Sequence, residues 1–422
     1  MAAAEAMSRL ITGAVPSGPH DASRLTLLIL LLVVVLPSAV MTIFGATSMA
    51  LGIALTAVIL ISHGVIDLYF GTRMSRRRLA RWILVTTGFV LVLTAQSLFA
   101  SAYGDEQDTQ RLFGGLALLV LIWGASGIFA ERLSTCSDRS VDRLVTWGLW
   151  FLAVNAALGL SGVVVVAHAS FKACGVFSEP SHLAMVSAPL LLYATARRLR
   201  RCELVLASFF MWGLLIQNLT MLVVVILAVL PLIRLRFKAL LMLSVFVAML
   251  MMVLGQSEPA MEYFRDRLVI DESTDNLSVL VLLRGWEYAL QAIDISRGWG
   301  LGFQQFGVTY IGGDVLAKLQ AQGLGDQNLL DGGTAAAKIV GELGYVGIFL
   351  LAWYVLFAAK CMCDMRRASG GETPHWRTFL RAGVVGVSIE MFVRGAGYFT
   401  PDFFILFTAI SAAVIGLKRI NT

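Results

Sequence analysis

Charged side chains are scarce in this sequence. Asp, Glu, Lys and Arg make up 14% of the 422 residues, whereas hydrophobic residues make up 58%. Soluble globular domains carry charge on roughly a quarter of their residues, because their surfaces face water. This composition excludes a soluble globular domain. It predicts an all-α integral membrane protein with the lipid bilayer as its surroundings.

Cysteine and histidine are also few, with five of each. Their spacing suits neither a metal site nor a disulfide framework, and only Cys174 falls on the predicted outer side of the membrane. The sequence also lacks the glycine-rich fingerprints of nucleotide-binding loops. We therefore expect no metal, no cofactor and no disulfide.

Basic residues exceed acidic ones, 33 to 27, but they gather in short loops between apolar runs. Such placement signals orientation in a membrane and does not indicate a nucleic-acid partner. The loop at 73–81 is strongly basic, and the loop at 105–108 is acidic. If the basic loops are cytoplasmic, both termini are cytoplasmic as well.

Apolar runs long enough for membrane helices recur along the chain. They lie at about 25–44, 48–68, 82–102, 112–130, 144–166, 182–196, 240–254, 339–359, 379–397 and 403–417. The first run is too long for the apolar part of a signal peptide, so we expect it to be retained. With two further crossings inside 204–233, the chain has about twelve spans.

The stretch 204–233 is flanked by arginine and lysine on both sides, so both flanks should be cytoplasmic. An even number of crossings then requires two short helices that turn near Gln217 and Asn218. Such a broken pair is tolerated where protein or water covers the turn, which suggests a cavity above it. The alternative is one long tilted helix.

The polar stretch 256–338 divides the chain into a first membrane part, 1–255, an outer loop and a last membrane part, 339–422. Within it, 278–293 has the spacing of an amphipathic helix. We expect this helix to lie as a lid on the bundle and to turn Arg284 toward an anionic ligand near Glu179. Its expected polar face holds Arg284, Glu287, Tyr288 and Gln291, and its apolar face holds Leu282, Trp286, Ala289, Leu290 and Ile293. An ion pair between Arg284 and Glu287 is the alternative.

The outer loop before the sixth run contains Gly175, which permits a turn, and Pro180, which suits the first turn of a helix. Glu179 then stands at a helix N-terminus, where a carboxylate accepts hydrogen bonds from free amides. One interpretation is therefore a simple helix cap. The other is that Lys172, Glu179 and His182 meet at the outer face as a substrate site.

Four ionisable residues fall inside or at the start of predicted spans. Glu390 and Arg394 are four residues apart, as are Lys338 and Glu342. Ionisable groups in membrane helices normally face the bundle interior or a wet cavity. Each pair is interpreted either as a structural ion pair or as a substrate contact. Arg265 and Arg267 add positive charge to the outer loop, where a solvated helix is the alternative.

Three motifs resemble the Wzy-type O-antigen polymerase and O-antigen ligase superfamily. Residues 172–181, K-A-C-G-V-F-S-E-P-S, are similar to its R-x-x-G-x-F-x-E-P-S loop. Arg284 to Ile293, followed by Gly300, Gly302 and Phe306, resembles its R-x-x-x-W-x-x-A-L-x-x-I…G-x-G…F segment. Residues 342–347 resemble its E-x-G-x-x-G motif.

The resemblance implies a GT-C-like, metal-independent membrane glycosyltransferase of the bacterial inner membrane. Its donor and acceptor would be oligosaccharides on undecaprenyl pyrophosphate, and its site would face the periplasm. Arg284, with Lys172 and Arg394, would hold the pyrophosphate, and Glu179 would act as base or position the sugar. A chain-length regulator and a flippase are candidate partners.

The ligase branch of this superfamily usually has a histidine shortly before E-x-G, whereas 331–338 contains none. This difference favours a polymerase, which would add the glycan to the next lipid-linked repeat unit. The alternatives are a ligase that passes the glycan to lipid A core or protein, and a flippase or secondary transporter. The broken pair at 204–233 and the ionisable residues within spans are typical of transporters.

Overall fold

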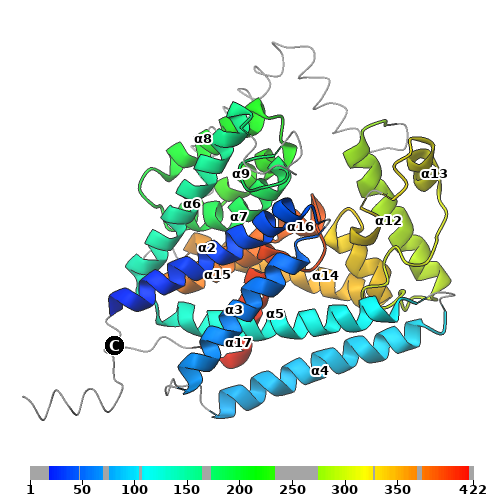
Figure 1. The fold of residues 1–422 in the computed structure, drawn as a ribbon, viewed down its shortest axis with the longest axis horizontal. Helices are drawn as coiled ribbons and strands as arrows, with labels where there is room; N and C mark the ends of the chain where they lie inside the picture. Colours follow the sequence, from blue (N-terminus) through cyan, green and yellow to red (C-terminus); the bar gives the residue numbers. More distant parts are fainter. Residues whose placement is uncertain are drawn as a thin grey trace, which may run out of the picture.

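The computed structural model describes residues 19–46, 48–69, 76–103, 107–163, 173–232, 274–326, 328–367 and 373–417. The regular secondary structure of this described part consists of helices (Figure 1). Its helices are α2 (Pro19–Phe44), α3 (Ala50–Tyr69), α4 (Arg76–Ala100), α5 (Thr109–Thr135), α6 (Asp138–Ser161), α7 (Pro180–Ala196), α8 (Cys202–Leu215), α9 (Leu219–Val229), α12 (Leu277–Ile295), α13 (Asp314–Ala321), η1 (Leu329–Asp331), α14 (Ala335–Arg367), α15 (His375–Gly386), α16 (Ser388–Phe392) and α17 (Pro401–Ile415).

Four of the described helices are long and apolar enough to cross a membrane: α4, α5, α6 and α14. Their outward faces carry large apolar side chains, including Leu84, Phe349 and Leu356, which are each at least 70% exposed. Water would disfavour such surfaces, and lipid would not. The prediction of an all-helical chain with the character of a membrane protein is confirmed.

Helix α7 forms the centre of the bundle. Every residue from His182 to Ala196 is buried, because α6, α9 and α15 all pack against it. A helix that is apolar on all sides is stable only when surrounded in this way. Its N-terminus is consequently held in a fixed place, and the loop that carries Glu179 is held with it.

The described part of the stretch 204–233, residues 204–232, contains two short helices, α8 and α9, and the turn between them, as predicted. The turn between them contains Gln217 in a left-handed conformation with φ of 56°, and the side chain of Asn218 caps α9 by accepting from the backbone N–H of Met221. The alternative of one long helix is wrong.

The predicted span 379–397 is not one helix. Helix α15 is followed by the single turn α16, and the chain from Val393 to Thr400 is not helical. The backbone N–H of Gly395 donates to the carbonyl of Gly333 at 2.9 Å, which replaces a helical partner with one from a distant segment. A side chain at Gly395 would collide with the backbone of Thr334 and Ala335. Arg394 therefore lies beyond the end of the helix.

Helix α14 is interrupted at Gly344, whose φ of 58° and ψ of −134° are not helical. The interruption frees the carbonyl oxygens of Gly341 and Glu342, which accept hydrogen bonds from the N–H groups of Leu301 and Gly302, both at 2.9 Å. The N–H of Tyr345 donates to the carbonyl of Gly298 at the same distance. The predicted G-x-G and E-x-G motifs thus meet, backbone against backbone.

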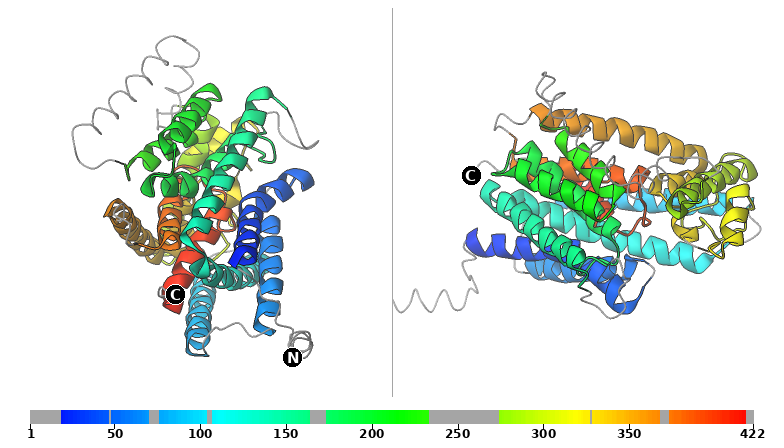
Figure 2. Two further views of the ribbon diagram at one scale, coloured as in Figure 1. Left: turned by 90° about the vertical axis from the view of Figure 1, so that its left-hand side faces the viewer. Right: turned by 90° about the horizontal axis from the view of Figure 1, so that it is seen from above.

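The predicted amphipathic helix is present as α12, and Ala289 and Ile293 are buried as expected, but three residues lie on the opposite face from the one predicted. Arg284 and Tyr288 lie on the buried face, whereas Leu290 is 59% exposed. The buried face packs on α14, and Gly285 allows it to approach the carbonyl of Gly332. Figures 1 and 2 show α12 and α13 together at one end of the bundle, beside α14.

Candidate functional site

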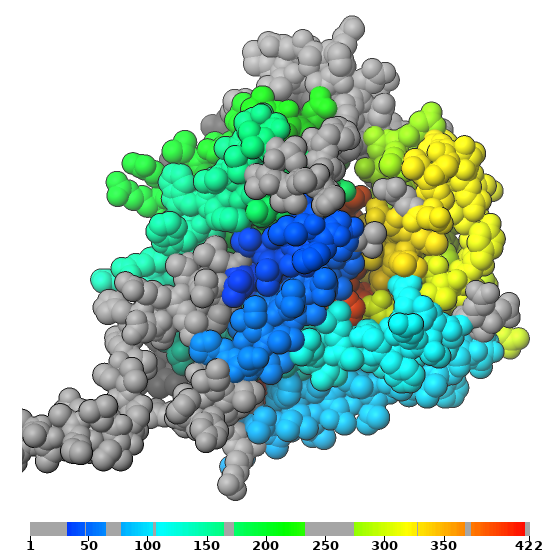
Figure 3. All heavy atoms as spheres, viewed as in Figure 1, coloured from blue at the N-terminus to red at the C-terminus, as the bar shows by residue number. Residues whose placement is uncertain are grey.

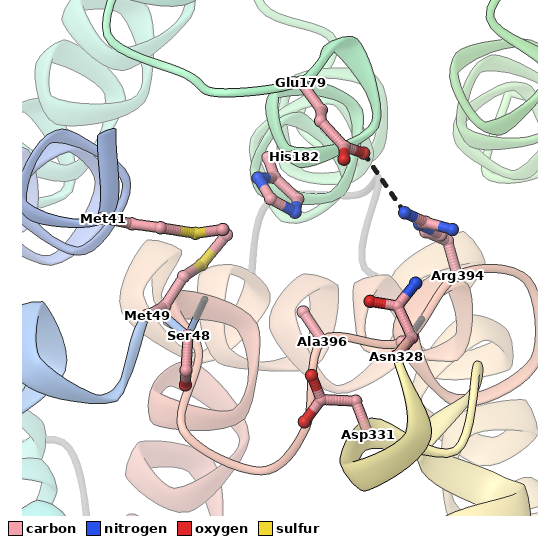
Figure 4. A pocket seen from close by; sticks show the side chains of 10 residues that line it. Met41, Ser48, Met49, Glu179, His182, Asn328, Asp331, Arg394 and Ala396 are labelled. Atoms are coloured by element: carbon pink, nitrogen blue, oxygen red, sulfur yellow. Dashed lines mark hydrogen bonds and ion pairs between the residues drawn. The ribbon is translucent and has the colours of Figure 1, made fainter. Parts of the chain in front are cut away.

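A small cavity, with about 380 Å³ of empty space when its open mouth is included, lies where four chain segments meet. The segments are the connection from α2 to α3, the N-terminus of α7, the region of η1 and the chain after α16 (Figure 4). Its lining residues are Met41, Ser48, Met49, Glu179, His182, Asn328, Asp331, Arg394, Gly395 and Ala396. Most of the polar groups come from loops, which rigid helices on either side hold in place.

Glu179 stands at the N-cap position of α7, and Pro180 occupies the first turn as predicted. Its carboxylate does not cap the helix. It accepts a hydrogen bond from Ser181 Oγ at 2.9 Å and pairs with the Nη2 of Arg394 at 3.2 Å. The interpretation as a simple cap is therefore wrong, and the carboxylate faces the cavity in Figure 4.

The preceding loop is fixed by a turn at Gly175, where φ is 62°. The N–H of Val176 donates to the side-chain oxygen of Asn155 at 2.9 Å, and Cys174 and Phe177 form an antiparallel bridge. A side chain at Gly175 would collide with Asn155. The turn was predicted from the sequence, and it gives Glu179 its approach to the cavity.

The charge on Glu179 is set by its neighbours. Burial raises the pKa of its carboxyl, but the positive charge of Arg394, then His182 and the hydrogen bonds from Ser181 and Arg394, lower it by more. The net result is a pKa below the ordinary value of 4.5. The carboxylate is therefore ionised at neutral pH, which makes it a partner for Arg394 and a weak proton acceptor.

His182 lies in the first turn of α7, with only 5% of its surface exposed. Its Nδ1 is 2.9 Å from the hydroxyl of Ser178, and the ring lines the same cavity as Glu179. The predicted meeting of a carboxylate and a histidine at this loop is thus found. Lys172, the third predicted member, lies outside the described residues.

Arg394 and Glu390 do not form the predicted pair. Arg394 reaches across the cavity to Glu179, whereas Glu390 is fully buried and accepts a hydrogen bond from Thr400 Oγ1 at 2.7 Å. The helix ends between them, so the four-residue spacing no longer places them on one face. Of the two, Arg394 alone lines a cavity.

A larger cavity, with about 820 Å³ of empty space when its open mouth is included, adjoins the first, and the two share Ser48, Asp331 and Ala396. Figure 3 shows a hollow between the blue α2–α3 region and the yellow segment before α14, with red C-terminal residues inside. The other lining residues are Ala50, Arg111, Gly114, Gly115, Leu118, Gln304, Leu330, Lys338, Gly397, Tyr398 and Phe399. Helices α8 and α9 line neither of these two cavities, so neither is the cavity expected above their turn.

Lys338 and Glu342 form a buried ion pair at one wall of the larger cavity, as one of the two interpretations predicted. Their Nζ and Oε1 are 3.8 Å apart, and both side chains are almost fully buried. Lys338 also donates to the carbonyl of Leu330, and Tyr398 donates its hydroxyl proton to Glu342 at 2.8 Å. Every charge is therefore compensated, as burial requires.

Arg284 does not reach either cavity. Its Nη1 donates to the carbonyl of Gly325 at 2.7 Å, and 3% of the residue is exposed. Glu287 accepts from the N–H of Asp314 at the start of α13, and Tyr288 donates to the carbonyl of Thr309. The expected orientation of Arg284 toward Glu179 is wrong. Arg265 and Arg267 lie outside the described residues.

Sequence reasoning missed Arg111, Gln304, Asn328 and Asp331 as cavity residues. Asp331 precedes two glycines with φ of 69° and 68°, which turn the chain into α14. A polar residue beside a glycine pair at the start of a buried helix is the signal that was available. Nothing in the sequence near Arg111 or Gln304 indicates a cavity, because their cavity forms only where α5 and the loop after α12 meet.

The arrangement offers a guanidinium, a carboxylate and an imidazole to one ligand. Among the described residues, no group of three or more His, Cys, Asp or Glu side chains is placed to hold a metal ion. An arginine beside a cavity binds phosphate or carboxylate groups through paired N–H donors. Carboxylate and imidazole accept hydrogen bonds from hydroxyl groups. The site therefore suits a ligand that carries both an anion and hydroxyl groups.

No protein-family model matches this sequence, and no curated protein shows significant similarity to it.

Proposed function

We propose that this protein is a membrane glycosyltransferase of the polysaccharide polymerase type. It transfers a growing glycan from undecaprenyl pyrophosphate onto the next lipid-linked repeat unit at the periplasmic face of the bacterial inner membrane. The proposal includes a GT-C-like fold with about twelve spans, cytoplasmic termini, and a chain-length regulator and flippase as partners.

One observation carries the proposal: Arg394 and Glu179, 215 residues apart in the chain, meet at 3.2 Å across a cavity that His182 also lines. Glu179 belongs to the motif that resembles the polymerase loop, and Arg394 supplies the cation that a pyrophosphate leaving group needs. The contact of the G-x-G and E-x-G motifs at Gly344 is a second support, because it joins the other two motif regions into one structure.

The chemistry of the transfer defines a role for each group. The bond between the anomeric carbon and the pyrophosphate oxygen breaks, and the pyrophosphate leaves with the electron pair. A guanidinium placed beforehand stabilises this anion without a metal. Glu179 holds Arg394 in place before the substrate binds, and His182 accepts a hydrogen bond from a sugar hydroxyl.

Replacement of Arg394 by alanine in cells tests the proposal. We expect polymer to disappear from gels of surface glycan while single repeat units remain, because removal of one preorganised donor typically costs about 10²- to 10³-fold in rate. Arg381→Ala is the matched control: Arg381 pairs with Asp364, also at 3.2 Å, and lines neither cavity. Normal chain lengths in the Arg394 variant at normal protein level would overturn the proposal.

The same gels separate the alternatives. A ligase variant would leave long chains on the carrier lipid, whereas a polymerase variant leaves single repeats attached to their final acceptor. Purified protein with lipid-linked repeat units tests for transport. Movement of the lipid without new glycosidic bonds would identify a flippase or transporter.

A further inference from the structure

Three polar side chains that line the larger cavity have no hydrogen-bond or ion-pair partner among the described residues. Within the described part of the chain, Arg111, Gln304 and Asp331 make no side-chain hydrogen bond or ion pair. Gln304 is nevertheless 93% buried, since only 7% of it is exposed. Buried polar groups normally have partners, so an unpartnered amide at a cavity wall indicates a ligand with hydrogen-bonding groups.

Two of these three residues, Gln304 and Arg111, lie on segments that are tied to each other. Gln305, next to Gln304, makes two hydrogen bonds to the backbone of Asp108, at 2.9 Å and 3.0 Å. Asp108 in turn caps α5, the helix that carries Arg111 in its first turn. The loop with Gln304 and the helix with Arg111 are thereby fastened together, and the cavity between them is preformed.

Aromatic residues also line the cavity. Tyr398 stacks on Phe303 with centroids 5.7 Å apart and has Lys338 Nζ 5.2 Å from its own centroid, so the half-buried ring of Phe399 is the freer of the two aromatic lining rings. A sugar combines an apolar ring face with hydroxyl groups that both donate and accept hydrogen bonds. Aromatic rings, an arginine donor, an amide and a carboxylate acceptor match that combination.

We propose that the larger cavity binds the terminal sugar of the acceptor glycan and that Asp331 takes the proton from its attacking hydroxyl. This inference rests on the proposed transferase function. Asp331 lines both cavities and therefore stands between the acceptor sugar and Arg394. The hydroxyl O–H bond breaks as its oxygen bonds to the anomeric carbon, the proton passes to the Asp331 carboxylate, and the pyrophosphate leaves with its electron pair. Asp331 then releases the proton to water.

A glycine in the cavity wall allows a test that leaves the packing intact. A side chain at Gly114 would meet no atom within 4 Å, so Gly114→Phe fills the cavity without a collision at its own Cβ. Gly88 on α4 is equally open and lines neither cavity, which makes Gly88→Phe the matched control. The purified full chain is assayed with extracted lipid-linked polymer as donor and extracted single lipid-linked repeat units as acceptor.

We expect Gly114→Phe to raise the KM for the single repeat unit by about tenfold or more, and Gly88→Phe to leave it unchanged. Asp331→Asn keeps the shape of the side chain and should lower kcat by about 10²- to 10⁴-fold with little change in KM. If the wild type forms no glycosidic bond from these lipids, the proposed function fails. If the wild type is active and both variants match it, the acceptor site alone is refuted. Because Asp331→Asn is nearly isosteric, it decides the question even if Gly114→Phe does not fold.

Discussion

Two arginines in this protein have opposite surroundings. Arg284 lies on a regular helix, is 3% exposed and donates to the backbone carbonyl of Gly325. Arg394 lies beyond the end of a helix, has a side chain that is 23% exposed, and pairs with Glu179 across a cavity. The first has its charge satisfied by the fold. The second faces a space that can admit a ligand.

The comparison shows that the position of an arginine in a motif does not by itself identify a substrate contact. Arg284 belongs to the segment that the sequence predicts to be an amphipathic helix, yet the buried face of α12 includes it. Arg394 belongs to a predicted membrane span that the structure breaks open. The two arginines differ in their surroundings, because packing covers Arg284 inside α12 whereas the helix ends before Arg394. Three experiments make this difference measurable.

The largest effect should follow the loss of the Arg284 side chain. Arg284→Ala removes a charged hydrogen bond to the Gly325 carbonyl and leaves that carbonyl near α12 without this donor. We expect the free energy of unfolding to fall by about 2–3 kcal/mol. Thermal unfolding in detergent measures this change.

The turnover of the folded Arg284→Ala fraction should stay near that of the wild type, because Arg284 lines neither cavity. Arg143→Ala, which removes an exposed arginine from the surface of α6, should change neither quantity. An Arg284 variant with normal stability but no activity would show instead that Arg284 contacts the substrate and is not needed for the fold.

A smaller effect should come from Arg394→Lys. Lysine keeps the positive charge but loses the two parallel N–H donors that fit a phosphate group. We expect kcat/KM for the lipid-linked donor to fall about tenfold, which corresponds to about 1.4 kcal/mol of transition-state stabilisation. Steady-state kinetics of the purified variant measure it, with Arg381→Lys as the control outside the cavities. Equal rates for Arg394→Lys and the wild type would show that simple charge suffices.

The smallest effect concerns pH and stability. The pKa of Glu179 is below 4.5 in the folded protein, mainly through Arg394 acting against burial. A carboxyl whose pKa is lower in the folded chain stabilises the fold at pH values above its pKa in the unfolded chain. This contribution is lost as the pH falls through the pKa in the folded chain. Because the Glu179 side chain is 44% exposed, the effect should be at most about 1 kcal/mol.

Urea unfolding at pH 7 and at pH 3 measures that contribution. In Arg394→Ala the difference in unfolding free energy between the two pH values should shrink by the same amount, because the group that lowers the pKa has been removed. An unchanged difference would mean that Arg394 does not set the charge of Glu179.

Features that depend on neighbouring residues could be predicted from the sequence. The arginines on both sides of 204–233 required an even number of crossings, and the chain does turn at Gln217 and Asn218. Gly175 and Pro180 similarly placed the turn and the start of α7. In each case the signal belongs to the segment itself: the charges at its two ends, or the residue that forms the turn or starts the helix.

Features that depend on distant segments could not be predicted. The break after α16 is held by a hydrogen bond from Gly395 to Gly333, 62 residues earlier in the chain. The burial of Arg284 depends on Gly325, which lies 41 residues away in sequence. Nothing near either residue indicates these partners. The cavity residues Arg111 and Gln304 were missed for the same reason.

The junction at Gly344 has a consequence for how this protein tolerates change. Three backbone hydrogen bonds tie the segment from Gly298 to Gly302 to α14, so the attachment is made by atoms that every amino acid except proline possesses. Side chains on the exposed surface of α12 can therefore vary widely while the segment stays docked. The attachment is vulnerable at its glycines instead: at Gly344 a Cβ would come within 2.0 Å of the Gly298 carbonyl oxygen, so even alanine there would detach one motif region from the other.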